Sequence, residues 1–180
     1  MSDTVFTRNG HLPETRLLSD VSFLVRRDTM VESFQIIYVY KNILKSASTV
    51  FEEIYTGDLK KSKKENSDLE IKVKDMDPSG DMLRWIYTDE VTLSLNSVCS
   101  LLYSNEKYDL SFLNKMSISF ITNAPSEDSC YFLNDLKLHC ATHLVPWLIQ
   151  RIVLSPSVTL SCDSLLEIKD SEVLNDILSY

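Results

Sequence analysis

Glycine is scarce in this chain, which has only three among its 180 residues, at Gly10, Gly57 and Gly80. A loop that cradles phosphate groups needs several closely spaced glycines, so the dinucleotide-binding and P-loop fingerprints are excluded. No apolar run approaches the ~20 residues that a membrane-spanning helix needs. The polar N-terminus, MSDTVFTRNG, is not typical of a secretory signal. We therefore expect a cytoplasmic protein, with a nuclear location as the alternative, and no membrane partner.

Histidine and cysteine, the usual residues of metal sites and nucleophilic catalysis, are also few. His139 and His143 are four apart and could share a helix face, but no third ligand is suggested nearby. A hydrogen-bonded or solvent-facing pair is therefore favoured over a metal site. A hydrolase that uses Cys140 and His143 is the least favoured hypothesis and serves only for comparison with the others. The cysteines form no disulfide or zinc-ligand pattern, and their apolar neighbours predict buried, reduced thiols at Cys99, Cys130, Cys140 and Cys162. We expect no metal and no cofactor.

The chain is acidic, with a formal net charge of -8 and a sequence pI ≈ 4.9. Affinity for nucleic acid depends on clustered Lys and Arg, so no nucleic-acid partner is expected. One basic run occupies residues 60–64, where a solvated loop is favoured over a partner contact. The adjacent pairs Glu52-Glu53 and Asp89-Glu90 are interpreted as surface charge and not as a catalytic pair, because acid–base catalysis needs two carboxyls converging on one pocket. No catalytic residue is predicted.

Hydrophobic patterning predicts a mixed first half and a helical second half. Residues 1–16 are polar and are expected to form a flexible arm. Alternation predicts strands at 21–25 and 69–73, and the β-branched and aromatic stretch 34–40 predicts a strand buried on both faces. Helical spacing is found at 79–88, 96–108, 111–122, 127–137, 139–154, 163–168 and 171–178. The fold class predicted is α+β, followed by an all-helical extension over 126–180.

Local signals mark several helix ends. Thr49-Val50-Phe51-Glu52 has the spacing of a capping box, in which the Thr49 hydroxyl would bond to the Glu52 N–H. Gly57 suits the end of that helix. Gly80 falls inside the helix predicted for 79–88, where it would cost roughly 0.5–1 kcal/mol. Pro146 should start or kink its helix. Phe51 and Tyr55 share one helix face, which predicts a core role for Phe51 and leaves that of Tyr55 open.

A series of short steps, in order, resembles a BTB (POZ) domain over residues 17–122. The steps are Ser19-Asp20-Val21, Lys41-Asn42-Ile43-Leu44, Ser48-Thr49-Val50-Phe51, Gly57-Asp58-Leu59, Ile86-Tyr87-Thr88 and Lys107-Tyr108. No single step is specific, and their order and spacing carry the resemblance. It implies a small sheet flanked by helices. Residues 126–180 resemble a shortened BACK segment, which is all-helical.

The pattern as a whole is similar to BTB-BACK-PHR adaptors of cullin ubiquitin ligases, without the PHR module. This resemblance implies a non-enzymatic homodimer that docks on a cullin scaffold and serves an unknown substrate protein. By resemblance, the cullin face would contain Glu52, Glu53, Tyr55, Leu59, Lys61, Tyr108 and Asp109. By resemblance, the dimer interface would contain Leu17, Leu18, Val21 and Phe23.

Two departures from that pattern keep a second hypothesis open. Cullin-binding members often carry a hydrophobic-x-Glu triplet after the Gly-x-Leu step, whereas this chain has Leu59-Lys60-Lys61, with the opposite charge at the last position. The chain also ends at Tyr180, which leaves no room for a substrate-recognition module. The alternative is therefore a dimerising BTB scaffold, or a truncated competitor of full-length adaptors, without a ligase role.

Overall fold

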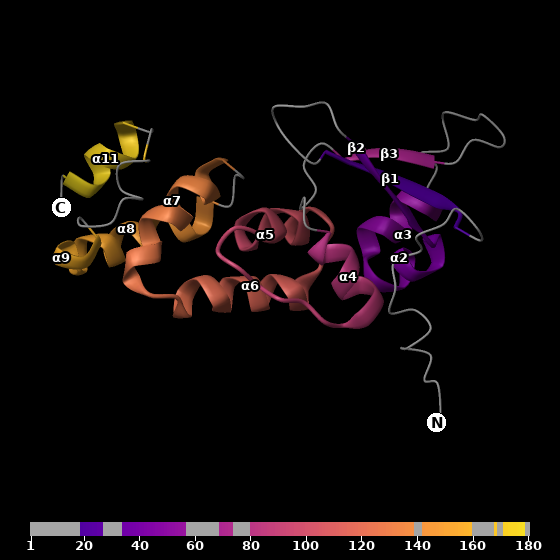
Figure 1. Ribbon diagram of the computed structural model, residues 1–180, viewed down its shortest axis with the longest axis horizontal. Helices are drawn as coiled ribbons and strands as arrows, with labels where there is room; N and C mark the ends of the chain where they lie inside the picture. Colours follow the sequence, from indigo (N-terminus) through magenta and orange to yellow (C-terminus); the bar gives the residue numbers. More distant parts are fainter. Residues whose placement is uncertain are drawn as a thin grey trace, which may run out of the picture. The chain divides into compact units, whose positions relative to one another are not determined.

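A three-stranded sheet with the order β2-β1-β3 is built around the first strand (Figure 1). β1 (Val21–Arg26) pairs antiparallel with β2 (Phe34–Val39) and parallel with β3 (Leu69–Val73). The strands predicted from alternation and β-branching are thereby confirmed. A parallel pair needs a crossover connection, and two helices between β2 and β3 in the chain supply it. The computed structural model describes residues 19–26, 34–56, 69–73, 80–138, 142–159, 168 and 171–178.

The prediction that the second strand is buried on both faces is wrong. Ile37 and Val39 are buried, but the side chain of Ile36, which directly precedes Ile37, is 51% exposed. Helices α2 (Lys41–Ala47) and α3 (Thr49–Thr56) lie against one face of the sheet (Figure 1). Successive side chains of a strand point to opposite faces, so only every second residue of β2 reaches this covered side. The run of β-branched residues reports strand propensity rather than burial.

Helix α4 (Asp81–Thr88) begins later than its sequence suggests, so the prediction that Gly80 lies in the helix interior is wrong. Gly80 directly precedes the helix with φ 74°, and its carbonyl accepts the first helical hydrogen bond, from the Arg84 N–H at 2.9 Å. Glycine enters this left-handed region without the steric cost that a Cβ imposes. Gly80 therefore forms the entry to α4 rather than a weak point within it.

Two hydrogen bonds attach the start of α2 to its surroundings. The Lys41 N–H, one of the amides that a helix start leaves without a partner, donates to Asp20 Oδ1 at 2.7 Å. The Tyr40 N–H donates to the hydroxyl of Tyr87 on α4, also at 2.7 Å. Burial raises the pKa of Tyr87 to about 12, although the hydrogen bond from Tyr40 opposes the shift. These contacts give the Asp20 and Tyr87 positions of the sequence pattern a structural role.

The chain divides into two compact units. The first consists of Met1–Thr92 and Ser104–Leu113, and the second of Leu93–Tyr103 and Asn114–Tyr180. Helices α5 (Val98–Lys107) and α6 (Ser111–Asn123) contribute residues to both units. Both helices were predicted within two residues of these bounds. The domain boundaries proposed from the sequence stay predictions.

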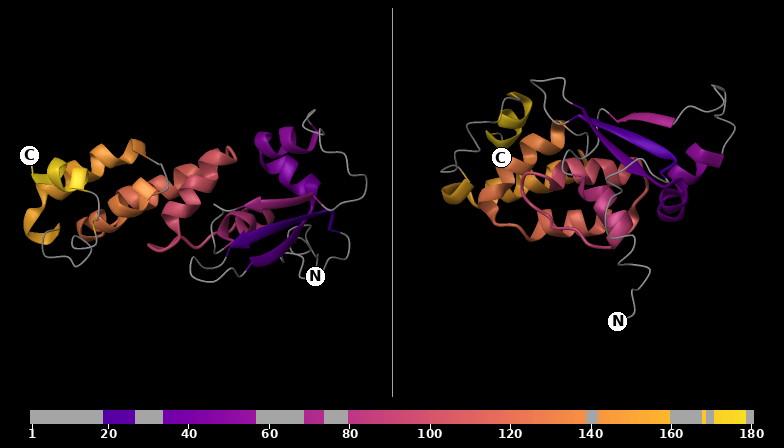
Figure 2. Two further views of the ribbon diagram at one scale, coloured as in Figure 1. Left: turned by 90° about the horizontal axis from the view of Figure 1, so that it is seen from above. Right: turned by 45° about the vertical axis from the view of Figure 1, so that its right-hand side comes forward.

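Among the described residues of the second unit, all regular secondary structure is helical. Its remaining elements are η1 (Ser126–Asp128), α7 (Ser129–Leu138), η2 (Thr142–Leu144), α8 (Val145–Leu154), α9 (Pro156–Thr159) and α11 (Ser171–Leu178). Helix α8 packs against α7 and α11 (Figure 2). Pro146 lies in the first turn of α8, as predicted. The helix expected at 163–168 lies outside the described residues, except for the buried Ile168.

Apolar side chains from α5, α6, α7 and α8 fill the core of the second unit. Cys99 and Cys130 belong to this core and form no disulfide, which confirms the prediction of buried thiols at these two positions. Cys140 and His139 lie outside the described residues, and among the described ones no group of three His, Cys, Asp or Glu side chains could hold a metal ion. Of the helices described, none is long and apolar enough to cross a membrane.

Candidate protein-interaction site

Ser48 forms the junction between α2 and α3. Its backbone is extended, with φ -149° and ψ 128°, and its N–H closes α2 on the Leu44 carbonyl at 3.1 Å. Its hydroxyl then accepts the Phe51 N–H at 3.1 Å, and its carbonyl accepts the Glu52 N–H at 3.0 Å. This is the geometry of a helix N-cap. Ser48 and Phe51 are therefore the N-cap and N3 residues of α3, which explains their spacing in the Ser-x-x-Phe step.

The capping box predicted for Thr49 and Glu52 is wrong by one residue. Thr49 is already the first residue of α3, so its side chain cannot cap the helix from outside. The Thr49 hydroxyl instead donates to Asp109 Oδ2 at 3.1 Å. Two serine or threonine residues in succession made the sequence ambiguous, and the extended backbone of Ser48 decides between them.

The Ser48 hydroxyl also joins α3 to the end of α5. It donates to the Tyr108 carbonyl at 2.5 Å, across 60 residues of sequence, while it accepts the Phe51 N–H. The Ser48 side chain is buried, so this contact is shielded from water. The two contacts with α3, from Ser48 to Tyr108 and from Thr49 to Asp109, are called the α3 clamp below.

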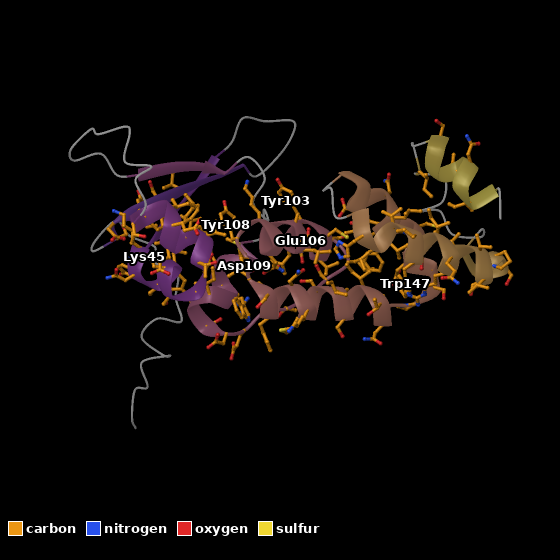
Figure 3. The ribbon with its side chains drawn as sticks, turned by 180° about the vertical axis from the view of Figure 1, so that it is seen from behind. Lys45, Tyr103, Glu106, Tyr108, Asp109 and Trp147 are labelled. Atoms are coloured by element: carbon orange, nitrogen blue, oxygen red, sulfur yellow. The ribbon has the colours of Figure 1, made fainter. Side chains whose placement is uncertain are left out.

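The turn after α5 has the hydrogen bonds of a Schellman motif. The Leu110 N–H donates to the Asn105 carbonyl at 2.9 Å, and the Asp109 N–H donates to the Glu106 carbonyl at 3.4 Å. Asp109 lies between them with φ 52°, in the left-handed region that Asp tolerates better than most residues. Figure 3 labels Tyr108 and Asp109 at this turn, beside α3. The motif fixes the backbone from which the Asp109 side chain extends.

An aromatic cluster lies beneath the α3 clamp. The rings of Phe51 and Tyr108 stack with centroids 4.4 Å apart and an interplanar angle of 13°. Phe51 also meets Phe23 edge to face at 6.1 Å and stacks with Tyr55 at 6.3 Å. Such pairs contribute roughly 0.5–1.5 kcal/mol each beyond the burial of their area. The cluster gives the α3 clamp a rigid base, and it confirms the core role predicted for Phe51, which is fully buried.

Tyr55 lies at the edge of the cluster, half-buried on α3. Its hydroxyl oxygen is buried and finds no hydrogen-bond partner among the residues that the structure describes. Burial raises the pKa of Tyr55 well above its usual value, and Tyr108 and Asp20 raise it further. The hydroxyl is therefore protonated at neutral pH and remains a hydrogen-bond donor.

The residues predicted by resemblance for the cullin face differ in exposure. Tyr108 is only 4% exposed, so its side chain supports the surface from below and offers little contact area of its own. Leu59 and Lys61 lie outside the described residues. The carboxylates that the α3 clamp brings onto one exposed surface belong to Glu52, Glu53 and Asp109. We call this surface the α3 face. Its role in binding a cullin stays a prediction.

The residues predicted by resemblance for the dimer interface are in part buried within the protomer. Val21 and Phe23 are 2% and 0% exposed, because both point from β1 to the helix-covered side of the sheet. Side chains so deeply buried act on an interface through the strand that they hold in place, not through contact area. Leu17 and Leu18 lie outside the described residues. The dimer interface also stays a prediction.

Comparison with known proteins agrees with the resemblance in its coarser part. The family model described as "BTB/POZ domain" matches residues 10–124. BTB/POZ domain-containing protein 6 of Xenopus tropicalis is 29% identical over 138 residues, which cover 75% of this chain and 25% of that protein. BTB/POZ domain-containing protein 3 of Homo sapiens is 28% identical over 134 residues, covering 73% and 24%. The chain thus spans about a quarter of the length of these curated relatives.

Among solved structures, the BTB domain of zebrafish PATZ1 resembles the chain with a TM-score of 0.49 and 15% identity, over 65% of this chain and 90% of that one. The matched family range ends at residue 124, before α7, so the BACK-like assignment of the later helices stays a prediction. The family range covers the sheet, the helix pair and the α3 face, and the α+β fold predicted from the sequence is confirmed. The chain belongs to the BTB/POZ family.

Proposed function

We propose that the protein is a non-enzymatic adaptor that dimerises through its BTB domain and docks on a cullin scaffold of a ubiquitin ligase. BTB/POZ domains are protein-interaction modules that commonly dimerise and bind partner proteins. The observation that carries the finer proposal is the α3 clamp. It joins Thr49 on α3 to Asp109, 60 residues later in the chain, so that Glu52 and Glu53 on the same helix and Asp109 on the turn after α5 belong to one surface.

The α3 face suits a docking surface because its parts have different roles. The buried rings of Phe51 and Tyr108 keep the helix and the turn from moving apart. The exposed carboxylates supply charge, which guides partner choice and the rate of encounter more than it adds affinity. A rigid, acidic surface of this kind favours a partner whose contact residues are basic.

A second candidate function is a dimerising scaffold without a ligase role. Lys61 favours it, because this residue stands where cullin-binding members of the resembling group often carry a Glu. A cation at that position would repel the same partner group that the acidic α3 face attracts. Under either proposal, a substrate protein and a module that binds it are expectations, since the chain spans about a quarter of the length of its relatives.

Binding of the purified chain to a purified cullin, measured by isothermal titration calorimetry, tests the proposal. The double variant Glu52→Lys, Glu53→Lys reverses two exposed charges of the α3 face. Glu90→Lys reverses one charge at an exposed position on the turn after α4, and serves as a control for charge reversal away from the α3 face. We expect the double variant to lose binding and the control to keep it.

A wild-type chain that binds no cullin would overturn the ligase role and favour the scaffold. Dimerisation is tested separately by light scattering at micromolar concentration. The expected mass is twice the 20.7 kDa of one chain. A clean monomer would overturn both candidates, because each requires the BTB domain to dimerise.

A further inference from the structure

The contact between Thr49 and Asp109 joins two exposed residues from different parts of the first unit. Thr49 Oγ1 donates to Asp109 Oδ2 at 3.1 Å, across 60 residues. Neither residue is needed to fill the core, since both side chains are exposed. The backbone around each is already held, by the Ser48 cap on one side and the Schellman hydrogen bonds on the other. The side-chain contact between Thr49 and Asp109 therefore has a role other than holding the backbone in place.

Thr49 is well suited to hold a carboxylate still. Its β-branched side chain has few χ1 rotamers, and it lies on the first turn of a capped helix. An exposed Asp rotates about two side-chain torsions, and a partner that binds it must stop this rotation at a cost in entropy. A hydrogen bond to one carboxylate oxygen stops the rotation before the partner arrives. The second oxygen, Oδ1, receives no hydrogen bond from the part of the chain that the structure describes.

We propose that Thr49 is a positioning residue that holds the Asp109 carboxylate ready for a cationic Lys or Arg side chain of the docking partner. The inference rests on the docking function proposed above and extends it to the chemistry of the partner. An ionised carboxylate only accepts hydrogen bonds, and its strong ligands are the N–H groups of cations. Thr49 touches Asp109, and it acts on the partner through that carboxylate.

Thr49→Val tests the proposal with little disturbance of the fold. Valine keeps the branched shape and removes only the hydroxyl, whereas Thr49→Ser keeps the hydroxyl and serves as the rescue variant. Asp109→Gly removes the carboxylate and suits the left-handed backbone at φ 52°, so it is not expected to strain the turn. The double variant closes a thermodynamic cycle.

We expect Thr49→Val to weaken cullin binding about fourfold, the effect of losing one hydrogen bond to an exposed charged group. Thr49→Ser should bind as the wild type does. In the Asp109→Gly background, Thr49→Val should have no further effect. The loss should also shrink at high salt, because the partner's charge is then screened, whereas a purely structural defect would not respond in this way.

Equal losses from Thr49→Val with and without Asp109 would overturn the proposal, as would full binding by Thr49→Val when the wild type binds. A second measurement needs no partner. The Hα–Hβ couplings of Asp109, measured by NMR, should indicate one χ1 rotamer in the wild type and averaging in Thr49→Val. Averaged couplings in the wild type would overturn the positioning role. A wild type that binds no cullin but shows a single rotamer would overturn the docking function. The Asp109 side chain would then be held in place, but not for a cullin.

Discussion

Ser48→Ala removes a single hydroxyl that makes two hydrogen bonds, and its cost follows from both. Loss of an N-cap serine costs about 1 kcal/mol of stability, here through the bond from the Phe51 N–H. Loss of the hydrogen bond to the Tyr108 carbonyl costs a further ~0.5–1.5 kcal/mol, since the site is buried. The free energy of unfolding of the first unit should therefore fall by about 2 kcal/mol. In urea this lowers the midpoint of unfolding by about 1 M.

Fluorescence of Trp85 reports the unfolding of the first unit, if the second tryptophan is removed by Trp147→Phe. Ser46→Ala is the matched control, because the exposed Ser46 hydroxyl donates only to Ile43 within the same helix, at 2.8 Å. The control should stay within about 0.5 kcal/mol of the parent. An equally small change in Ser48→Ala would refute the reasoning, because it would mean that the contact with Tyr108 adds no stability.

Three further predictions concern other residues. Burial raises the pKa of Tyr87 from 10.0 to about 12, so this tyrosine ionises at a lower pH in the unfolded chain than in the folded one. The stability that Tyr87 contributes is therefore complete below pH ~10 and is lost as pH rises through ~12. Urea midpoints measured near pH ~9 and ~11 should differ less in Tyr87→Phe than in the wild type. Lys61→Glu should strengthen cullin binding about tenfold in calorimetry, with Lys61→Gln between the two; binding that ignores both changes would remove the charge argument. Burial raises the pKa of the Cys99 thiol and Asp135 raises it further, so Cys99 and the buried Cys130 should escape iodoacetamide in the native protein and react in urea, as read by peptide mass spectrometry.

Elements whose cause is local were predictable from the sequence. Alternation along Val21, Phe23 and Val25 predicts β1, since a period of two follows from strand geometry alone. Helix α6, predicted at 111–122, is found at Ser111–Asn123. Pro146 marks the start of α8 because proline lacks the N–H that the first helical turn leaves unused anyway. In each case the deciding interaction lies within one turn or one strand.

The parts that failed depend on contacts between distant segments. Ile36 is exposed because helices cover one side of the sheet, which no feature within 34–40 records. Both Thr49-x-x-Glu52 and Ser48-x-x-Phe51 fit an N-cap spacing. The choice of Ser48 follows from its bond to Tyr108, sixty positions away, and from its role in closing α2. The Ser-x-x-Phe step was the available signal, because an N-cap and N3 lie three positions apart with two residues between them.

The same helix thus carries the family pattern on one side and the candidate docking surface on the other. Ser48 and Phe51, which belong to the pattern, are buried and hold α3 to the sheet and to the end of α5. Thr49, Glu52 and Glu53, which interleave with them, are exposed. We therefore expect substitutions on the buried side to act on stability, and those on the exposed side to act on the proposed docking. A relative that is 28–29% identical can therefore share the α3 clamp and bind a different partner, so the family assignment leaves the cullin proposal to be decided by the exposed residues alone.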